Sequence, residues 1–276
     1  DLVGELARAC HRRGFPLGLY YSVVDWRHPN YPNRGRHHEL PGPESGDAPD
    51  WERYFDFLKA QVRELCTQYG PVRHFFWDMN VPEHRDSSVN EMIRTLQPGI
   101  VINDRGFDEG DFGTPEREYQ REQTGQRVRF SRPTEACNSV GTQSWGFRKA
   151  EEYYTEPFLI GSIDGVLARG GHYLLNVGPD GKGRIPRQAV EILKTIGAWY
   201  GAVREAFGDA EPASDLIDDP GILATRRGAV LYVHVTNPRA DAVLLPRLQE
   251  KPGRAVVMND GSVTDVHADV LPVDWK

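Results

Sequence analysis

The chain has 276 residues, of which 39% are hydrophobic and 10% aromatic, enough for one large catalytic domain with a small module attached. Its formal net charge of -7 disfavours nucleic acid as a partner, because proteins that bind nucleic acid carry a basic face. No stretch reaches the roughly 18 apolar residues of a membrane span. Cys10, Cys66 and Cys137 are far apart and match neither a disulfide framework nor a zinc site, so we expect buried thiols.

Helix and strand patterns alternate from the first residue to about residue 208. In chain order we predict a helix at 1–13, a strand at 15–24, a helix at 51–69, a strand at 72–78, a helix at 88–96, strands at 99–104 and 135–138, a helix at 151–169, a strand at 173–177 and a helix at 186–207. Long loops at 25–50 and 105–132 interrupt the alternation, and such loops usually carry function. The alternation is typical of parallel βα units in an α/β fold.

Polar and aromatic side chains gather directly after the predicted strands, where a (β/α)8 barrel places its chemistry. They are Ser22, Asp25, Trp26, Asp78, Asn103, Asp104, Arg105 and Asn176. An open doubly wound sheet is the alternative, but no glycine-rich phosphate fingerprint opens a predicted helix. The run 178–183 resembles a phosphate loop only loosely, because it lacks the ending that contacts magnesium. We therefore expect a partial (β/α)8, TIM-like barrel.

Beyond about residue 209 the pattern changes to short strands separated by turn signals. We predict strands at 222–225, 229–236, 242–245, 255–258 and 263–266. This pattern indicates an antiparallel β-sandwich module, and we expect the module to be incomplete at residue 276. We divide the chain into a barrel domain at 1–208 and a sandwich domain at 209–276. Because the first helical pattern is already under way at Asp1, we expect the barrel to be truncated at this end, and the compartment stays unassigned.

Asp78 is the strongest candidate for a catalytic residue. It ends an apolar aromatic strand, where a carboxylate is unusual unless it caps a turn or serves chemistry. A carboxylate at a barrel mouth can trap the oxocarbenium-like centre that forms when a sugar acetal is cleaved. We therefore interpret Asp78 as the nucleophile of a retaining glycosidase.

This mechanism needs a second carboxyl group that protonates the leaving oxygen. Glu116 lies in a long loop, and Glu135 lies near the end of a predicted strand. The residues alone leave both open, because a glutamate in an exposed loop is usually solvated.

Further side chains fit a sugar pocket. Arg105 can bind sugar hydroxyls while Asp104 holds it in place. Trp145 can stack on a pyranose, although core packing is an equal alternative. Tyr20 and Tyr21 end one strand, so one is expected to face the core and the other the pocket. His37 and His38 are adjacent in the sequence, and adjacent histidines are poorly placed to bind one metal together. We expect no metal or other cofactor.

Seven segments in order resemble glycoside hydrolase family 29, the retaining α-L-fucosidases. They are residues 18–22 with 25–26, 76–78, 103–105, 114–116, 135–137, 144–147 and 170–186. The last is the most characteristic, and the order over about 170 residues makes the resemblance specific. In that family an upstream segment carries a His-His pair that binds fucose, and this chain starts after it. Met79 and Asn80 follow Asp78 where many relatives have glycine.

The resemblance implies a (β/α)8-like barrel followed by a β-sandwich, and an exo-acting retaining α-L-fucosidase. It implies Asp78 as nucleophile, with Glu116 favoured over Glu135 as acid/base. It also implies that the fucose pocket is lined by Tyr20, Trp77, Arg105 and Trp145. The expected partner is a fucosylated oligosaccharide or glycoconjugate, with no nucleic acid and no membrane. Two alternatives stay open: a non-catalytic carbohydrate-binding protein on this scaffold, and a retaining galactosidase.

Overall fold

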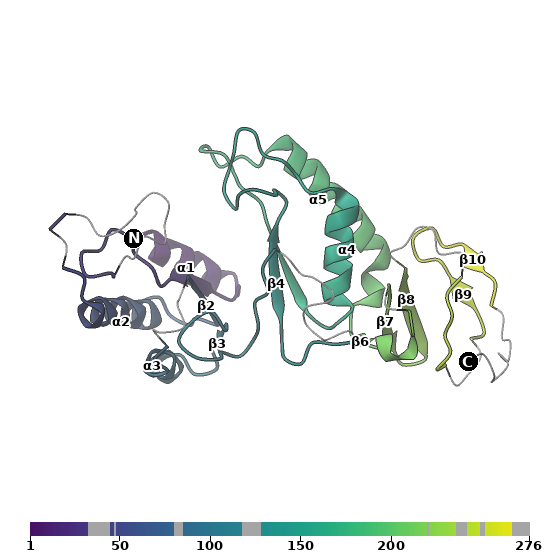
Figure 1. The fold of residues 1–276 in the computed structure, drawn as a ribbon, viewed down its shortest axis with the longest axis horizontal. Helices are drawn as coiled ribbons and strands as arrows, with labels where there is room; N and C mark the ends of the chain where they lie inside the picture. The colour runs from purple at the N-terminus through teal and green to yellow at the C-terminus, as the bar shows by residue number, and fades with distance from the viewer. Residues whose placement is uncertain are drawn as a thin grey trace. The chain divides into compact units, whose positions relative to one another are not determined.

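A computed structural model describes residues 1–32, 45–46, 48–79, 85–117, 128–219, 221–235, 242–248 and 252–266. His37 and His38 lie outside these ranges. The chain divides into two compact units, Asp1–Thr114 and Pro115–Lys276, and each is described by itself (Figure 1). The expected domain boundary at 208–209 falls within the second unit.

The first unit is a three-stranded parallel sheet with three helices, as the sequence pattern predicts. Its elements are α1 (Leu2–Arg12), β1 (Gly18–Ser22), α2 (Trp51–Gln68), β2 (His74–Asp78), α3 (Ser88–Leu96) and β3 (Val101–Ile102), with the strands in the order β1-β2-β3. Asp50 caps α2, because its carboxylate accepts from the Arg53 backbone N–H at 3.2 Å. The α/β class is thus confirmed for this unit.

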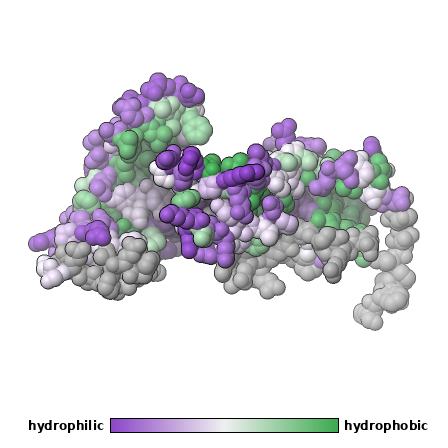
Figure 2. Space-filling model, turned by 90° about the horizontal axis from the view of Figure 1, so that it is seen from above, coloured by the Kyte–Doolittle hydropathy of each residue, from purple (hydrophilic) through white to green (hydrophobic). Residues whose placement is uncertain are grey.

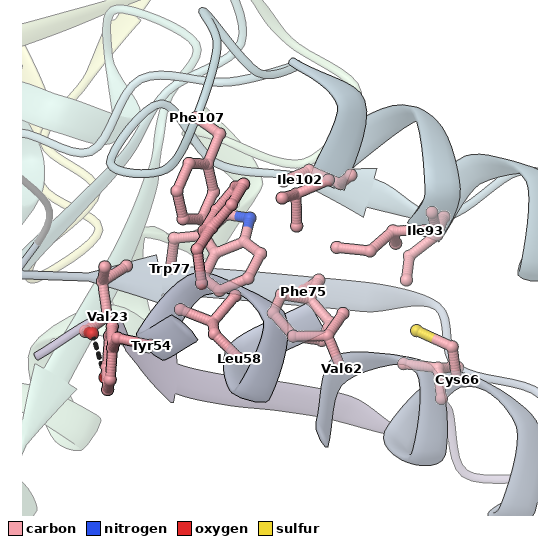
Figure 3. Close-up of a cluster of buried hydrophobic side chains, with 14 of the residues drawn as sticks. Val23, Tyr54, Leu58, Val62, Cys66, Phe75, Trp77, Ile93, Ile102 and Phe107 are labelled. Carbon is pink, nitrogen blue, oxygen red and sulfur yellow. Dashed lines mark hydrogen bonds between the residues drawn. The ribbon is translucent and has the colours of Figure 1, made fainter. Parts of the chain in front are cut away.

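All three helices pack on one face of this sheet. Phe75 and Trp77 of β2 are fully buried against Leu58 of α2 and Ile93 of α3 (Figure 3), and Ala7 of α1 joins the same core. On the other face, β1 and β2 pair in register, so that Tyr20 lies beside Phe76 and Ser22 beside Asp78. Tyr20 is 61% exposed there, which leaves this face of the sheet open within the unit.

The second unit begins with another βα pair of parallel strands. Its elements are β4 (Glu135–Ser139), α4 (Glu156–Leu167), β5 (His172–Asn176), α5 (Arg187–Val203) and a 3-10 turn (Arg204–Ala206). Helix α4 starts five residues later than predicted, because Thr155 caps it and Pro157 occupies the first turn. Leu175 packs under α4 and α5, whereas Leu174 on the opposite face is 49% exposed.

Antiparallel strands follow, as the change of pattern predicts. They form one three-stranded sheet, β6 (Glu211–Pro212), β7 (Ile222–Arg227) and β8 (Val230–Val235), and one hairpin, β9 (Ala255–Val256) with β10 (Val263–Thr264). The short β6 was missed. The predicted strand at 242–245 is wrong, because these residues form no strand with any part of the chain that the structure describes and instead supply Val243 and Leu245 to a core cluster.

The surface is mixed in character. On the face drawn in Figure 2, hydrophobic residues lie beside hydrophilic ones. The exposed large hydrophobic side chains include Phe15, Tyr20 and Leu174. Among the described residues, no helix combines the length and the apolar character that crossing a membrane requires.

Candidate active site

Asp78 is the last residue of β2, and both of its carboxylate oxygens accept a hydrogen bond. The Tyr20 hydroxyl donates to Oδ2 at 2.5 Å, and Arg105 Nη1 donates to Oδ1 at 3.2 Å. The side chains of Arg105 and Asp78 are only 18% and 22% exposed. These two bonds fix the orientation of the Asp78 carboxylate. Each carboxylate oxygen has two lone pairs, so each keeps one beyond the bond described here.

Arg105 is itself held by Thr114. Its Nε donates to Thr114 Oγ1 and its Nη2 donates to the Thr114 carbonyl, both at 2.8 Å. Thr114 Oγ1 in turn donates to Asp104 Oδ1 at 2.7 Å. Asp104 therefore supports Arg105 through Thr114, a residue not among the predicted site residues, and not by the direct charge-assisted hydrogen bond that we expected.

Phe76 forms an aromatic floor on the face that carries Asp78. Its ring stacks on Tyr20, with centroids 5.9 Å apart, and the Arg105 guanidinium lies 5.5 Å from its centroid. Phe76 was not among the predicted site residues. The signal was available, because residues two apart on a strand share a face.

Trp77 faces the opposite way, which corrects the expectation that it lines the sugar pocket. It has no exposed surface, and its indole N–H donates to Asn90 Oδ1 at 2.9 Å. The Asn103 side chain also pairs with both backbone groups of Trp77, at 2.7 and 2.9 Å, and so continues the sheet beyond the two residues of β3. Trp77 is thus part of the core that fixes β2.

The residue after the nucleophile candidate adopts a left-handed backbone. Met79 has φ 62°, a conformation that glycine takes without strain. This explains why glycine suits the position in the family that the chain resembles.

Glu116 and Glu135 lie on adjacent segments in the second unit. Residues 115–117 pair with β4, since Cys137 N donates to the Pro115 carbonyl and Arg117 N to the Cys137 carbonyl, both at 2.9 Å. Glu116 pairs with Cys137, so the two glutamates share one face of the sheet. Glu116 is exposed and Glu135 half-buried.

The two glutamates differ in height along the strand. Glu135 is the first residue of β4, whereas Glu116 lies level with Cys137, two residues closer to the carboxyl end. At about 3.3 Å per residue this is about 7 Å. Glu116 therefore lies nearer the edge where barrel enzymes hold their chemistry.

Trp145 lies at the carboxyl ends of β4 and β5. Asn176, the last residue of β5, donates to the Trp145 carbonyl at 2.6 Å, and the Ser139 hydroxyl donates to the Ser144 carbonyl at 3.2 Å. The Arg117 guanidinium lies 4.4 Å from the Trp145 ring centroid. The ring is 38% exposed, so it is accessible to a ligand.

Two further sequence features have structural explanations. Tyr21 faces the helices, as one of the two tyrosines was expected to, and burial with the nearby Asp25 charge raises the pKa of Tyr21 to about 12.

In the run 178–183, the Asp180 carboxylate accepts from the backbone N–H groups of Arg184 and Lys182, and these bonds lower its pKa. This run is a side-chain-stabilised turn.

The site thus has a carboxylate at the carboxyl edge of a parallel sheet, oriented by an arginine and a tyrosine beside an aromatic ring, and a carboxylate is the kind of group that α/β glycoside hydrolases use as nucleophile. Residues 1–205 match the family model described as alpha-L-fucosidase. The chain belongs to the α-L-fucosidase family.

Named relatives agree with this assignment. An α-L-fucosidase of Dictyostelium discoideum is 28% identical over 232 residues, covering 77% of this chain and 46% of its own length. The tissue α-L-fucosidase of Bos taurus is 26% identical and covers 84% of this chain and 50% of its own. The chain thus spans about half the length of the curated relatives it matches.

Solved structures are similar over most of the chain. Isoenzyme 1 of α-L-fucosidase from Paenibacillus thiaminolyticus aligns with TM-score 0.77 and 26% identity, covering 97% of this chain and 68% of that one. An α-L-fucosidase from Lactobacillus casei in complex with its α-L-fucose product aligns with TM-score 0.60 and 27% identity, covering 74% of this chain and 66% of that one.

Proposed function

We propose that the protein is a retaining exo-α-L-fucosidase with Asp78 as nucleophile and Glu116 as acid/base. The observation that carries the proposal is the fixed Asp78 carboxylate, with the Tyr20 hydroxyl at 2.5 Å and Arg105 Nη1 at 3.2 Å. Two donors hold the carboxylate in one rotamer, which lowers the entropy cost of attack at the anomeric carbon.

The proposed architecture is a partial (β/α)8 barrel domain at 1–208 followed by a β-sandwich domain at 209–276. Its support is that each parallel sheet, within its own unit, has helices on one face and site residues on the other. Parallel sheets are normally covered on both faces, and in a (β/α)8 barrel the face opposite the helices points to the interior. Tyr20 and Leu174 are exposed on that face of their own sheets.

Two arguments favour Glu116 over Glu135 as acid/base. The first is its height along β4, about 7 Å nearer the carboxyl end. The second argument is the short covalent link along the chain, because Glu116 lies two residues after Thr114 and Thr114 binds Arg105. Two residues of extended chain reach at most about 7 Å, so Glu116 cannot be far from the group that holds the nucleophile.

The proposed reaction has two displacements. Asp78 attacks the anomeric carbon, the bond to the leaving oxygen breaks, and Glu116 gives that oxygen a proton. The resulting fucosyl ester is then attacked by water, and Glu116 takes the water proton. Two inversions return the original configuration. Phe76 and Trp145 supply apolar faces for the sugar, and no step requires a metal or another cofactor.

The proposed substrate is the terminal α-L-fucose of a glycan. Its support is family membership and the Lactobacillus casei enzyme, whose structure holds α-L-fucose as product. A panel of aryl glycosides checks this choice, since a galactosidase would prefer a sugar with a hydroxymethyl group. Sugar binding without hydrolysis, measured on the full-length protein, would favour the alternative of a non-catalytic carbohydrate-binding protein.

The test is an Asp78→Gly variant of the full-length protein. We expect turnover of an aryl α-L-fucoside to fall at least about a thousandfold, because the nucleophile is removed. Azide should restore turnover by occupying the space and releasing a β-fucosyl azide. For the wild type, NMR should show α-L-fucose as the first product. The control is Asp56→Asn, an exposed carboxylate on α2. Full activity of Asp78→Gly would refute the assignment.

A further inference from the structure

The Thr114 side chain is 8% exposed and joins three groups of the candidate site. Its hydroxyl accepts from Arg105 Nε at 2.8 Å and donates to Asp104 Oδ1 at 2.7 Å. Its carbonyl accepts from Arg105 Nη2, also at 2.8 Å. One threonine therefore binds a whole edge of the guanidinium.

The direction of these bonds is set by chemistry. An ionised carboxylate can only accept and a guanidinium can only donate. The single hydroxyl proton of Thr114 must therefore point to Asp104, which turns a lone pair of its oxygen toward Arg105. Asp104 orients the hydroxyl, and the hydroxyl orients the arginine.

The guanidinium is planar and rigid, so two bonds on one edge fix its rotation. Nε and Nη2 form the edge that Thr114 binds, and Nη1 is left to donate to Asp78 at 3.2 Å. Without the hydroxyl, the arginine keeps its charge but loses one of the two bonds that aim it.

We propose that Thr114 is a positioning residue that, supported by Asp104, aims Arg105 at the Asp78 carboxylate. This inference rests on the proposed function, because it assigns a role in the reaction that Asp78 performs. It adds that the hydroxyl matters, and that a side chain of the same shape without one does not suffice.

The experiment compares Thr114→Val with Thr114→Ser in the full-length protein. Valine keeps the shape and removes the hydroxyl, whereas serine keeps the hydroxyl. We expect Thr114→Val to lower kcat for an aryl α-L-fucoside about tenfold to a hundredfold, since small misplacements of reacting groups cost that much. Thr114→Ser should stay within about threefold of wild type, because the bond is retained. Thr95→Val, an exposed threonine of α3, is the matched control.

A second readout does not depend on activity. In protein labelled with 15N-arginine, the Arg105 Nε–H should exchange with water at least about tenfold faster in Thr114→Val than in Thr114→Ser, because its acceptor is gone. Asp104→Ala acts on the same hydroxyl without touching Thr114, and it should also speed this exchange. Thermal unfolding reports whether each variant folds.

The outcomes separate the two proposals. If the wild type hydrolyses the fucoside but Thr114→Val and Thr114→Ser have equal kcat and equal Nε–H exchange, the role of Thr114 is refuted and the proposed function stands. If the wild type hydrolyses no fucoside, the proposed function fails, and the role of Thr114 in that reaction falls with it.

Discussion

At the end of β2, neighbouring aromatic residues serve opposite faces of the sheet. Phe76 lies under Tyr20 and Arg105 on the face of Asp78, whereas Trp77 is enclosed by the helices. The strand alternation makes the first a candidate for sugar contact and the second a core residue. Their substitutions should therefore differ in kind.

Trp77→Ala should lower the free energy of unfolding by about 3 to 5 kcal/mol, the range for deleting a buried aromatic side chain. Phe76→Ala should also lower that free energy, because the ring is only 9% exposed beneath Tyr20 and Arg105, but unlike Trp77→Ala it removes a ring from the face of Asp78. It should therefore lower kcat/KM of the folded protein for an aryl α-L-fucoside at least about tenfold. Denaturant unfolding and steady-state kinetics on both variants check this, and an unchanged kcat/KM in Phe76→Ala would contradict the assignment of Phe76 to the site face.

The roles of Glu116 and Glu135 can be distinguished with substrates that differ in their leaving group. In Glu116→Ala, an activated aryl fucoside should still form the ester, because its leaving group needs no proton. A fucosylated glycan should lose at least about a hundredfold in kcat/KM, in line with the usual worth of general acid catalysis.

Glu135→Ala is the matched control. Its ratio of kcat/KM for the activated aryl fucoside to kcat/KM for the fucosylated glycan should equal that of the wild type. If the dependence on leaving group appears in Glu135→Ala and not in Glu116→Ala, the acid/base assignment must be exchanged.

At the scale of elements, helix α3 is tied to the chain before it by an acidic residue. The Asp86 carboxylate accepts from the Ser88 backbone N–H at 2.9 Å, and Lys59 Nζ of α2 lies 3.8 Å away. Hydrogen bonds from Ser88, with a smaller contribution from the Lys59 charge, lower the pKa of Asp86. The charged form of this residue therefore stabilises the start of α3.

This shift predicts how stability depends on pH. Because the folded pKa of Asp86 lies below the unfolded value of about 3.9, its contribution is complete above that value and is lost as pH falls through the folded pKa. Asp86→Asn should be less stable than wild type at pH 7 by a few tenths of a kcal/mol, since the side chain is half-exposed.

The difference between Asp86→Asn and wild type should shrink as unfolding is measured from pH 5 downward. Asp56→Asn, which changes an exposed residue of α2, should show no such convergence. A difference that grows on acidification would reverse the sign of the argument.

At the scale of the whole molecule, a buried histidine–aspartate hydrogen bond joins the segment matched by the family model to the sheet that follows it. His234 Nδ1 of β8 lies 2.7 Å from Asp164 Oδ1 of α4, and both side chains are at most 10% exposed. Thr225 of β7 contacts His234 Nε2 at 3.1 Å and donates to the Ala206 carbonyl at 2.5 Å. These bonds fix the sheet against the helix.

His234→Leu should lower the free energy of unfolding by about 1 to 3 kcal/mol, because it leaves a buried oxygen of Asp164 without its hydrogen-bond partner. The double variant Asp164→Leu with His234→Leu should recover part of that loss, since the unpaired polar group is then also removed. A double-mutant cycle by denaturant unfolding measures the coupling. A single variant as stable as the wild type would show that the pair contributes nothing.

Most elements of the fold were predictable because their signals are local. Helix α3 has the predicted bounds, and α2 follows its apolar stripe and its cap. The errors have tertiary causes. Strand β3 is shorter than predicted because the Asn103 side chain takes over the pairing, and 242–245 packs as an apolar segment without strand partners.

The sequence by itself determined the alternation of helices and strands, the family, and Asp78 as the leading candidate, because periodicity and motif order are properties of the chain. Only the tertiary structure decided that Glu116 lies higher along β4 than Glu135 and that Thr114 binds Arg105. These facts depend on which strands pair and in which register. Such pairings join residues far apart in the sequence, so no local pattern contains them.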